Sequence, residues 1–156
     1  MQFPANWEEA RKIKYAEGFK IPAPRDYVGV EPITQPESRA LYNFTNRNNF
    51  RLTVSFHSQG KVIYWRYLDF LPENSFEIAK EFSQVSGYQL DETPLRSSFA
   101  GYRDWFIQDF NRPGFTIEVG EGQNPLPIYQ FNEIYSDIEG IFVLGMVLWI
   151  TLKFGD

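Results

Sequence analysis

The sequence contains no cysteine, which excludes disulfides, cysteine-ligated zinc and thiol nucleophiles. Positive charge is also not in excess: the net charge is −5, so there is no basic footprint for nucleic acid. The longest apolar stretch, residues 141–152, is shorter than the about 20 residues that cross a bilayer, and we expect a buried C-terminal helix there. The first residues carry neither a basic nor an apolar signal-peptide region.

What is present suits one globular domain. Of the 156 residues, 43% are apolar and 18% aromatic, which is ample for a packed core. We take residues 1–156 as one domain whose first 34 residues form an irregular lead. That segment contains four prolines and little periodicity, so we expect at most one helical turn in it, near residues 7–14.

Beyond the lead, strand and helix patterns alternate. Residues 50–58, 61–67 and 114–119 have the alternating or β-branched character of strands. A capping box of Thr34 and Glu37 opens a helix that ends near residues 46–49, with Leu41 and Phe44 on its apolar face. Further helices are expected at residues 74–86, 98–110 and about 128–152. This order predicts an α/β fold with a partly parallel sheet.

Two polar residues end predicted core strands, His57 and Glu118. Ligands of open α/β sheets bind beyond these strand ends. A lone histidine there is more often structural than a ligand, whereas a carboxylate among apolar strand residues is costly unless it is paired or functional. With one histidine and no cysteine, the chain has no recognisable motif for the three protein ligands of a catalytic zinc.

Three segments carry a resemblance to a known family: Ser55-Phe56-His57-Ser58-Gln59-Gly60, Ala100-Gly101-Tyr102-Arg103-Asp104-Trp105 and Phe115-Thr116-Ile117-Glu118. Together, with the ungapped spacing from Asp104 to Glu118, they resemble the zinc metallocarboxypeptidases of the carboxypeptidase A type. The resemblance implies that His57 is the third zinc ligand and Glu118 the catalytic glutamate. It also implies an α/β fold that is the C-terminal half of a mixed-sheet zinc carboxypeptidase, with helices packed on the sheet.

Finer features resemble one bacterial branch, the γ-D-glutamyl-(L)-diamino acid endopeptidases, which cut peptidoglycan peptides. They are Gln2-Phe3-Pro4-Ala5-Asn6-Trp7, Ala23-Pro24-Arg25-Asp26-Tyr27 and Arg112-Pro113-Gly114-Phe115. The implied mechanism has zinc lower the pKa of its bound water while Glu118 takes the proton and passes it to the leaving amine.

The resemblance places Arg103 at the base of the specificity pocket. A guanidinium there suits a substrate side chain that ends in a carboxylate, such as diaminopimelate, although an exposed helix arginine is the alternative. Arg96 falls where many family members have a mobile tyrosine, and it could form a second carboxylate clamp. Tyr102, Asp104 and Trp105 are expected to pack rather than to react.

The family's other zinc ligands, a His-x-x-Glu motif, are expected upstream of this chain. The chain alone should therefore be inactive, with an unpaired sheet edge that an N-terminal half or self-association covers. The expected partner is a peptide or muropeptide, not nucleic acid or membrane, in either the bacterial cytoplasm or the cell wall. The alternatives are a non-catalytic module that binds acidic cell-wall peptides through Arg96 and Arg103, and a structural remnant.

Overall fold

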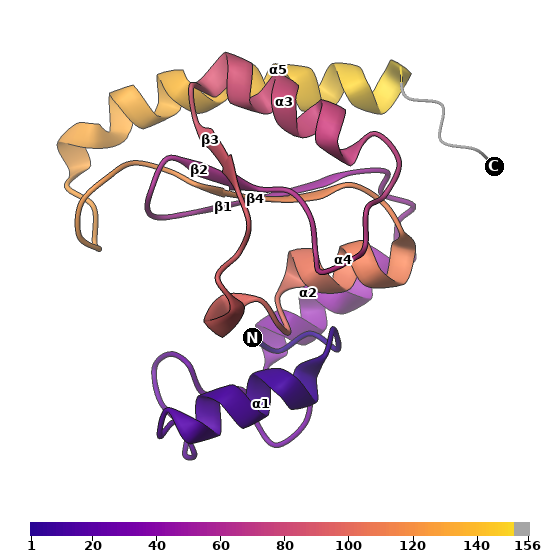
Figure 1. Cartoon of the computed structure of the whole chain (residues 1–156), viewed down its shortest axis with the longest axis vertical. Coiled ribbons are helices and arrows are strands. Elements are labelled where there is room, and N and C mark those ends of the chain that lie inside the picture. Colours follow the sequence, from indigo (N-terminus) through magenta and orange to yellow (C-terminus); the bar gives the residue numbers. More distant parts are fainter. Residues whose placement is uncertain (152–156) are drawn as a thin grey trace.

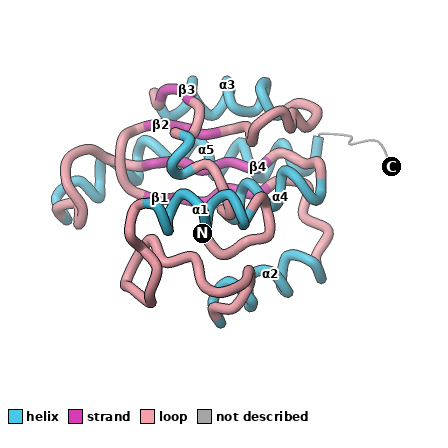
Figure 2. The backbone as a smooth tube through the Cα atoms, turned by 60° about the horizontal axis from the view of Figure 1, so that its bottom comes forward, coloured by secondary structure: helices cyan, strands magenta, loops and turns pink. Residues whose placement is uncertain are grey.

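Four strands form a mixed sheet in the computed structural model, which describes residues 1–151 and, of these, the side chains of residues 1–147. The spatial order is β1-β4-β2-β3, which Figure 2 shows as four neighbouring segments. β1 (Thr53–His57) runs parallel to β4 (Gly114–Glu118), and β2 (Val62–Tyr64) is antiparallel to β4 and parallel to β3 (Gln89–Asp91). The predicted α/β class with a partly parallel sheet is confirmed.

Helices cover both faces of the sheet (Figure 1). α3 (Ser75–Ser86) and α5 (Phe131–Thr151) lie together on one face, and α4 (Tyr102–Phe110) packs on the other, against β4 and β1. α2 (Pro36–Arg47) and α1 (Trp7–Ala16) lie beyond α4. Short 3₁₀ turns occupy Leu95–Ser97 (η1) and Ile128–Gln130 (η2). On the α4 side of the sheet, the helices leave the carboxyl ends of β1 and β4 open to a cavity.

Each face of the sheet has its own apolar cluster. Between the sheet and α3–α5 lie fully buried aromatic and branched side chains: Ile63, Ile78, Phe82, Phe115, Ile117 and Ile141. The second cluster joins the lead segment to α4 and contains Phe3, Trp7, Val28, Tyr67 and Trp105. β4 contributes to the first cluster through alternate residues, so its remaining side chains face α4.

The lead segment is more ordered than its prolines predict. The expectation of one helical turn is wrong, because α1 spans ten residues with Trp7, Ala10 and Lys14 on its buried side. The segment is also tied to the chain near α4, where the N–H of Phe3 donates to Ala100 and the N–H of Ala100 donates to Ala5. Burial of this face stabilises a helix that local propensity alone did not indicate.

The capping box at residues 34–37 does not form. Gln35 is the N-cap residue and makes no side-chain cap, while the Thr34 hydroxyl contacts the Gln2 side chain and the Glu31 carbonyl. Leu41 and Phe44, the expected apolar face of α2, are 39% and 56% exposed. The helix itself is confirmed, but the described chain places no layer over that face.

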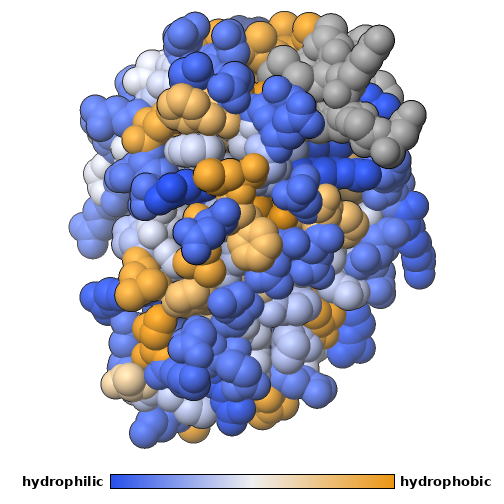
Figure 3. Space-filling model, turned by 45° about the vertical axis from the view of Figure 1, so that its right-hand side comes forward, coloured by the Kyte–Doolittle hydropathy of each residue, from blue (hydrophilic) through white to orange (hydrophobic). Residues whose placement is uncertain are grey.

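The C-terminal helix is only partly buried, contrary to expectation. Ile141 is buried, yet Val143 and Met146 are 52% and 64% exposed. No helix within residues 1–151 is long and apolar enough to cross a membrane. Exposed apolar side chains also appear as orange patches among hydrophilic residues in Figure 3.

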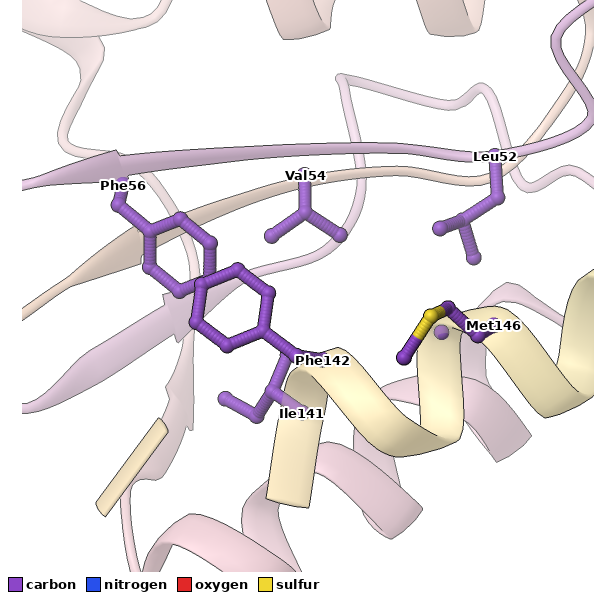
Figure 4. A pocket seen from close by; sticks show the side chains of 7 residues that line it. Leu52, Val54, Phe56, Ile141, Phe142 and Met146 are labelled. Atoms are coloured by element: carbon purple, nitrogen blue, oxygen red, sulfur yellow. The ribbon is translucent and has the colours of Figure 1, made fainter. Parts of the chain in front are cut away.

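The edge strand β1 borders an apolar groove. Its outer edge pairs with no strand in the described part of the chain. A cavity of about 500 Å³ separates β1 from α5 and is lined by Leu52, Val54, Phe56, Ile141, Phe142, Gly145 and Met146. Figure 4 shows the three strand side chains pointing toward the helix, with the Phe56 and Phe142 rings facing each other. We call this cavity the apolar groove.

Candidate active site

His57 and Glu118 are brought side by side by the sheet. They are register partners at the ends of the parallel strands β1 and β4. The N–H of Val119 donates to the His57 carbonyl over 2.7 Å, which extends the pairing past both residues. Because strand side chains alternate, Ser55 and His57 face away from the apolar groove. The two strand-end residues thus lie on the α4 side of the sheet.

Both residues line a cavity of about 550 Å³ with polar and apolar side chains on its wall, which we call the central cavity. Its wall comes from the sheet, η1, the start of α4, the first residues of the chain and α2, which contributes Ser38 and Leu41. The side chains on this wall include those of Ser55, His57, Tyr64, Thr93, Arg103, Asp104, Thr116 and Glu118. The carboxyl ends of the parallel strands thus open into a concave site, where ligands of α/β sheets bind.

The environment of Glu118 favours a carboxyl that can take up a proton. Glu118 is half-buried, and burial raises its pKa above the ordinary glutamate value. Electrostatic interactions with the nearby His57 and Arg103 side chains oppose this rise in pKa. A carboxyl with a raised pKa is a stronger proton acceptor than an exposed glutamate.

The described residues do not form a zinc site on their own. Catalytic zinc takes three protein ligands, and residues 1–151 contain no group of three histidine, cysteine or acidic side chains placed to hold a metal ion. His57 offers one imidazole at the mouth of the cavity, where it is exposed. Among the described residues, His57 is thus without the two further ligands that a catalytic zinc takes.

Arg103 lies in the first turn of α4 and is only 5% exposed. Its Nε and Nη2 donate to Asp104 Oδ1 over 3.1 and 2.5 Å, and Nη2 also donates to Thr93 Oγ1 over 2.8 Å. Asp104 Oδ2 accepts from the N–H of Gly101 over 3.0 Å and so caps the helix. A Cβ on Gly101 would lie 2.6 Å from that oxygen, so the turn requires glycine. The cap and the ion pair fix Arg103 on the wall of the cavity.

Arg96 is placed elsewhere. Its side chain is 78% exposed, and Nε donates to Glu17 Oε1 over 2.8 Å. Neighbouring residues of η1 line the central cavity, but Arg96 does not. The structure therefore gathers His57, Glu118 and Arg103 and leaves Arg96 paired with α1.

Several cavity residues were not anticipated from the sequence. Ser55 and Thr116 lie two residues before His57 and Glu118, so strand alternation could have identified them. Tyr64 and Thr93 carry no such signal. Their positions depend on the pairing of β2 with β4 and on the chain that follows β3.

The mixed sheet with helices on both faces is the architecture of the zinc carboxypeptidase fold. A model of the zinc carboxypeptidase family matches residues 1–141, and the chain belongs to that family. Gamma-D-glutamyl-L-diamino acid endopeptidase 1 of Lysinibacillus sphaericus is 48% identical over 149 residues, which are 94% of this chain and 36% of the relative. The chain thus spans little more than a third of that relative's length.

Solved structures share the fold at low sequence identity. Bovine thrombin-activatable fibrinolysis inhibitor, in complex with tick carboxypeptidase inhibitor, matches with a TM-score of 0.66 and 20% identity, over 81% of this chain and 49% of the other. Murein-tripeptide amidase MpaA from Escherichia coli O157 matches with a TM-score of 0.55 and 22% identity, over 83% of this chain and 46% of the other. These likenesses support the mixed α/β architecture.

Proposed function

We propose that this chain supplies Glu118 and His57 to a zinc-dependent peptidase that hydrolyses γ-D-glutamyl–diamino acid bonds in peptidoglycan peptides. The observation that carries the proposal is the register pairing of these two residues on one concave cavity. The substrate class is taken from the name of the 48% identical relative. As that relative is much longer, activity is assigned to the assembled site rather than to this chain alone.

Glu118 is proposed as the proton acceptor. Its carboxyl accepts a proton from the attacking water and returns it to the leaving amine, so a raised pKa suits both steps. His57 is proposed as one zinc ligand, and the remaining ligands are expected from polypeptide outside the described residues. The other ring nitrogen of a zinc-bound histidine is normally held by a hydrogen-bond acceptor.

We propose that the remaining peptidase polypeptide also covers the outer edge of β1 and the apolar groove. An edge strand with free backbone groups beside apolar side chains invites strand addition. The exposed side chains of Phe142 and Met146 line the same groove and make it apolar. Self-association of the isolated chain through the same edge is the competing outcome.

Arg103 is proposed to bind the acidic end of the substrate side chain, and Arg96 is not. Arg103→Lys keeps the charge but loses the planar fork, so we expect about tenfold weaker binding of an acidic muropeptide to the isolated chain. Arg96→Lys should change that affinity by less than about twofold, since Arg96 is exposed, pairs with Glu17 and does not line the central cavity. Isothermal titration calorimetry of both variants decides the matter. An equal loss in both would contradict the assignment.

A complementation assay tests the proposed enzyme. The complementing segment is the part of the Lysinibacillus sphaericus endopeptidase that this chain does not cover, expressed separately. Hydrolysis of a γ-D-glutamyl–diaminopimelate muropeptide is expected only when chain, segment and zinc are combined. No hydrolysis by the combination would refute the enzyme proposal.

A non-catalytic peptide-binding module is the second candidate function. It is favoured by one observation, that the described residues hold no metal-binding group of three. This candidate requires muropeptide binding that Glu118→Gln leaves unchanged and that a chelator does not abolish. It is rejected if the combined proteins hydrolyse the peptide.

A further inference from the structure

Tyr64 faces the same cavity as the proposed catalytic residue. It ends β2, where its register partner on β4 is Thr116, two residues before Glu118. Because alternate residues of a strand share a face, Thr116 and Glu118 point to the same side of the sheet. Tyr64 lines the central cavity, and the Cζ of Arg103 lies 5.8 Å from the centre of the Tyr64 ring. Tyr64 therefore shares one cavity with the proposed catalytic glutamate and lies beside the proposed acid-binding arginine.

Most of the hydrogen-bonding capacity of Arg103 is already used. A guanidinium has five N–H donors, and those on Nε and Nη2 are directed to Asp104 and Thr93. Nη1 makes no hydrogen bond with any residue that the structure describes. While Asp104 holds this arrangement, Arg103 has only Nη1 to offer to a ligand carboxylate. Arg103 therefore binds one oxygen of that carboxylate through Nη1, and the second oxygen needs a hydrogen-bond donor from another residue.

The Tyr64 hydroxyl is available for that second contact. It makes no hydrogen bond with the residues of the described chain, and its side chain is half-buried at the cavity wall. Burial raises the pKa of Tyr64, and the carboxylates of Glu118 and Asp91 raise it further, while Arg103 opposes them. The phenol therefore stays neutral and keeps its proton for donation.

Because the charges around the cavity are balanced, a carboxylate ligand needs specific hydrogen-bond donors in order to bind there. Arg103 is balanced by Asp104, and Glu118 adds a further carboxylate. Net positive charge is thus not what attracts an acidic ligand. A carboxylate is accepted only where specific N–H and O–H groups replace the water it leaves.

We propose that Tyr64 determines specificity, with its hydroxyl and Arg103 Nη1 binding the two oxygens of the side-chain carboxylate of a diamino-dicarboxylic acid residue. The proposal deepens the proposed function and rests on it for the substrate class. It predicts discrimination against lysine, whose side chain lacks this carboxylate. The role is one of recognition and not of proton transfer.

Binding of two free amino acids to the isolated chain tests the proposal. NMR titration should give a lower dissociation constant for meso-diaminopimelate than for L-lysine. Tyr64→Phe keeps the ring beside Arg103 and removes only the hydroxyl, so the diaminopimelate constant should rise about tenfold while the lysine constant is unchanged. Tyr129→Phe, a tyrosine 79% exposed outside the cavity, is the matched control and should change neither.

Two results would overturn the proposal. One is equal binding of diaminopimelate by Tyr64→Phe and wild type, and the other is an equal loss for both amino acids, which would mean a general structural role. The complementation assay separates this proposal from the proposed function. Hydrolysis with unchanged discrimination in Tyr64→Phe would reject only the role of Tyr64, whereas tyrosine-dependent binding without hydrolysis would reject only the enzyme.

Discussion

Replacing Glu118 by glutamine is expected to slow muropeptide hydrolysis by the complemented peptidase about 1,000-fold. Glutamine keeps the shape of the side chain but cannot accept a proton, and positioned general acid–base groups contribute about 10² to 10⁴-fold. Glu118 is the acidic residue that ends β4 beside His57, and burial raises its pKa. Steady-state kcat and KM measured with the complementing segment present would show the loss in kcat.

The matched control for this variant is Glu121→Gln. Glu121 lies three residues further along the chain and is exposed, so its replacement should leave kcat within about twofold. Equal midpoints of thermal unfolding for both variants and wild type would show that the loss of kcat does not come from a loss of stability. Retention of a tenth or more of the wild-type rate by Glu118→Gln would refute its role as proton acceptor.

Removing the Asp104 carboxylate is expected to cost about 3–5 kcal/mol of unfolding free energy. Asp104 is 2% exposed, pairs with Arg103 at 2.5 Å and caps α4 through the N–H of Gly101. Asp104→Ala leaves the Arg103 guanidinium buried without its counter-ion. Urea unfolding followed by circular dichroism measures the change.

Two further variants make the Asp104 result specific. Asp69→Ala removes an exposed carboxylate and should change stability by no more than about 0.5 kcal/mol. In the double variant Arg103→Met with Asp104→Ala, both charges are gone, so part of the lost stability should return. A loss below about 1 kcal/mol for Asp104→Ala would contradict a buried, tightly coupled pair.

The strands that carry the site could be predicted from the sequence, because the pattern of their own residues is typical of strands. Leu52, Val54 and Phe56 alternate along β1, and β4 is bounded by Pro113 and Gly120. β3 was missed, since Gln-Leu-Asp is short and has only one apolar residue. It forms because it pairs in parallel with the edge of β2. Such a long-range pairing cannot be predicted from the residues of β3 alone.

The site was predictable only where strand spacing determines it. His57 and Glu118 end two predicted strands, and both line the central cavity. Arg96 was expected beside them, but an ion pair with Glu17, 79 residues away in sequence, holds it outside. Such long-range pairs depend on how α1 packs and cannot be read from residues near Arg96.

Helical apolar faces gave a misleading expectation of burial. Leu41 and Phe44 lie on a predicted apolar face and Met146 lies in a helix that was expected to be buried, yet all three are substantially exposed. Periodicity identifies the side of a helix that prefers burial, not whether this chain provides what covers it. Of the three, Met146 lines the apolar groove beside β1, which we propose further peptidase polypeptide covers.

Zinc stoichiometry distinguishes a chain that supplies one zinc ligand from a chain that holds a complete zinc site. After dialysis against a limiting zinc buffer, metal content is measured by mass spectrometry for the chain, the complementing segment and their mixture. We predict less than about 0.1 zinc per isolated chain, because one imidazole is too few ligands, and about one per assembled pair. His57→Ala should lower the value for the pair. One tightly held zinc in the isolated chain, or an assembled pair indifferent to His57→Ala, would contradict the account.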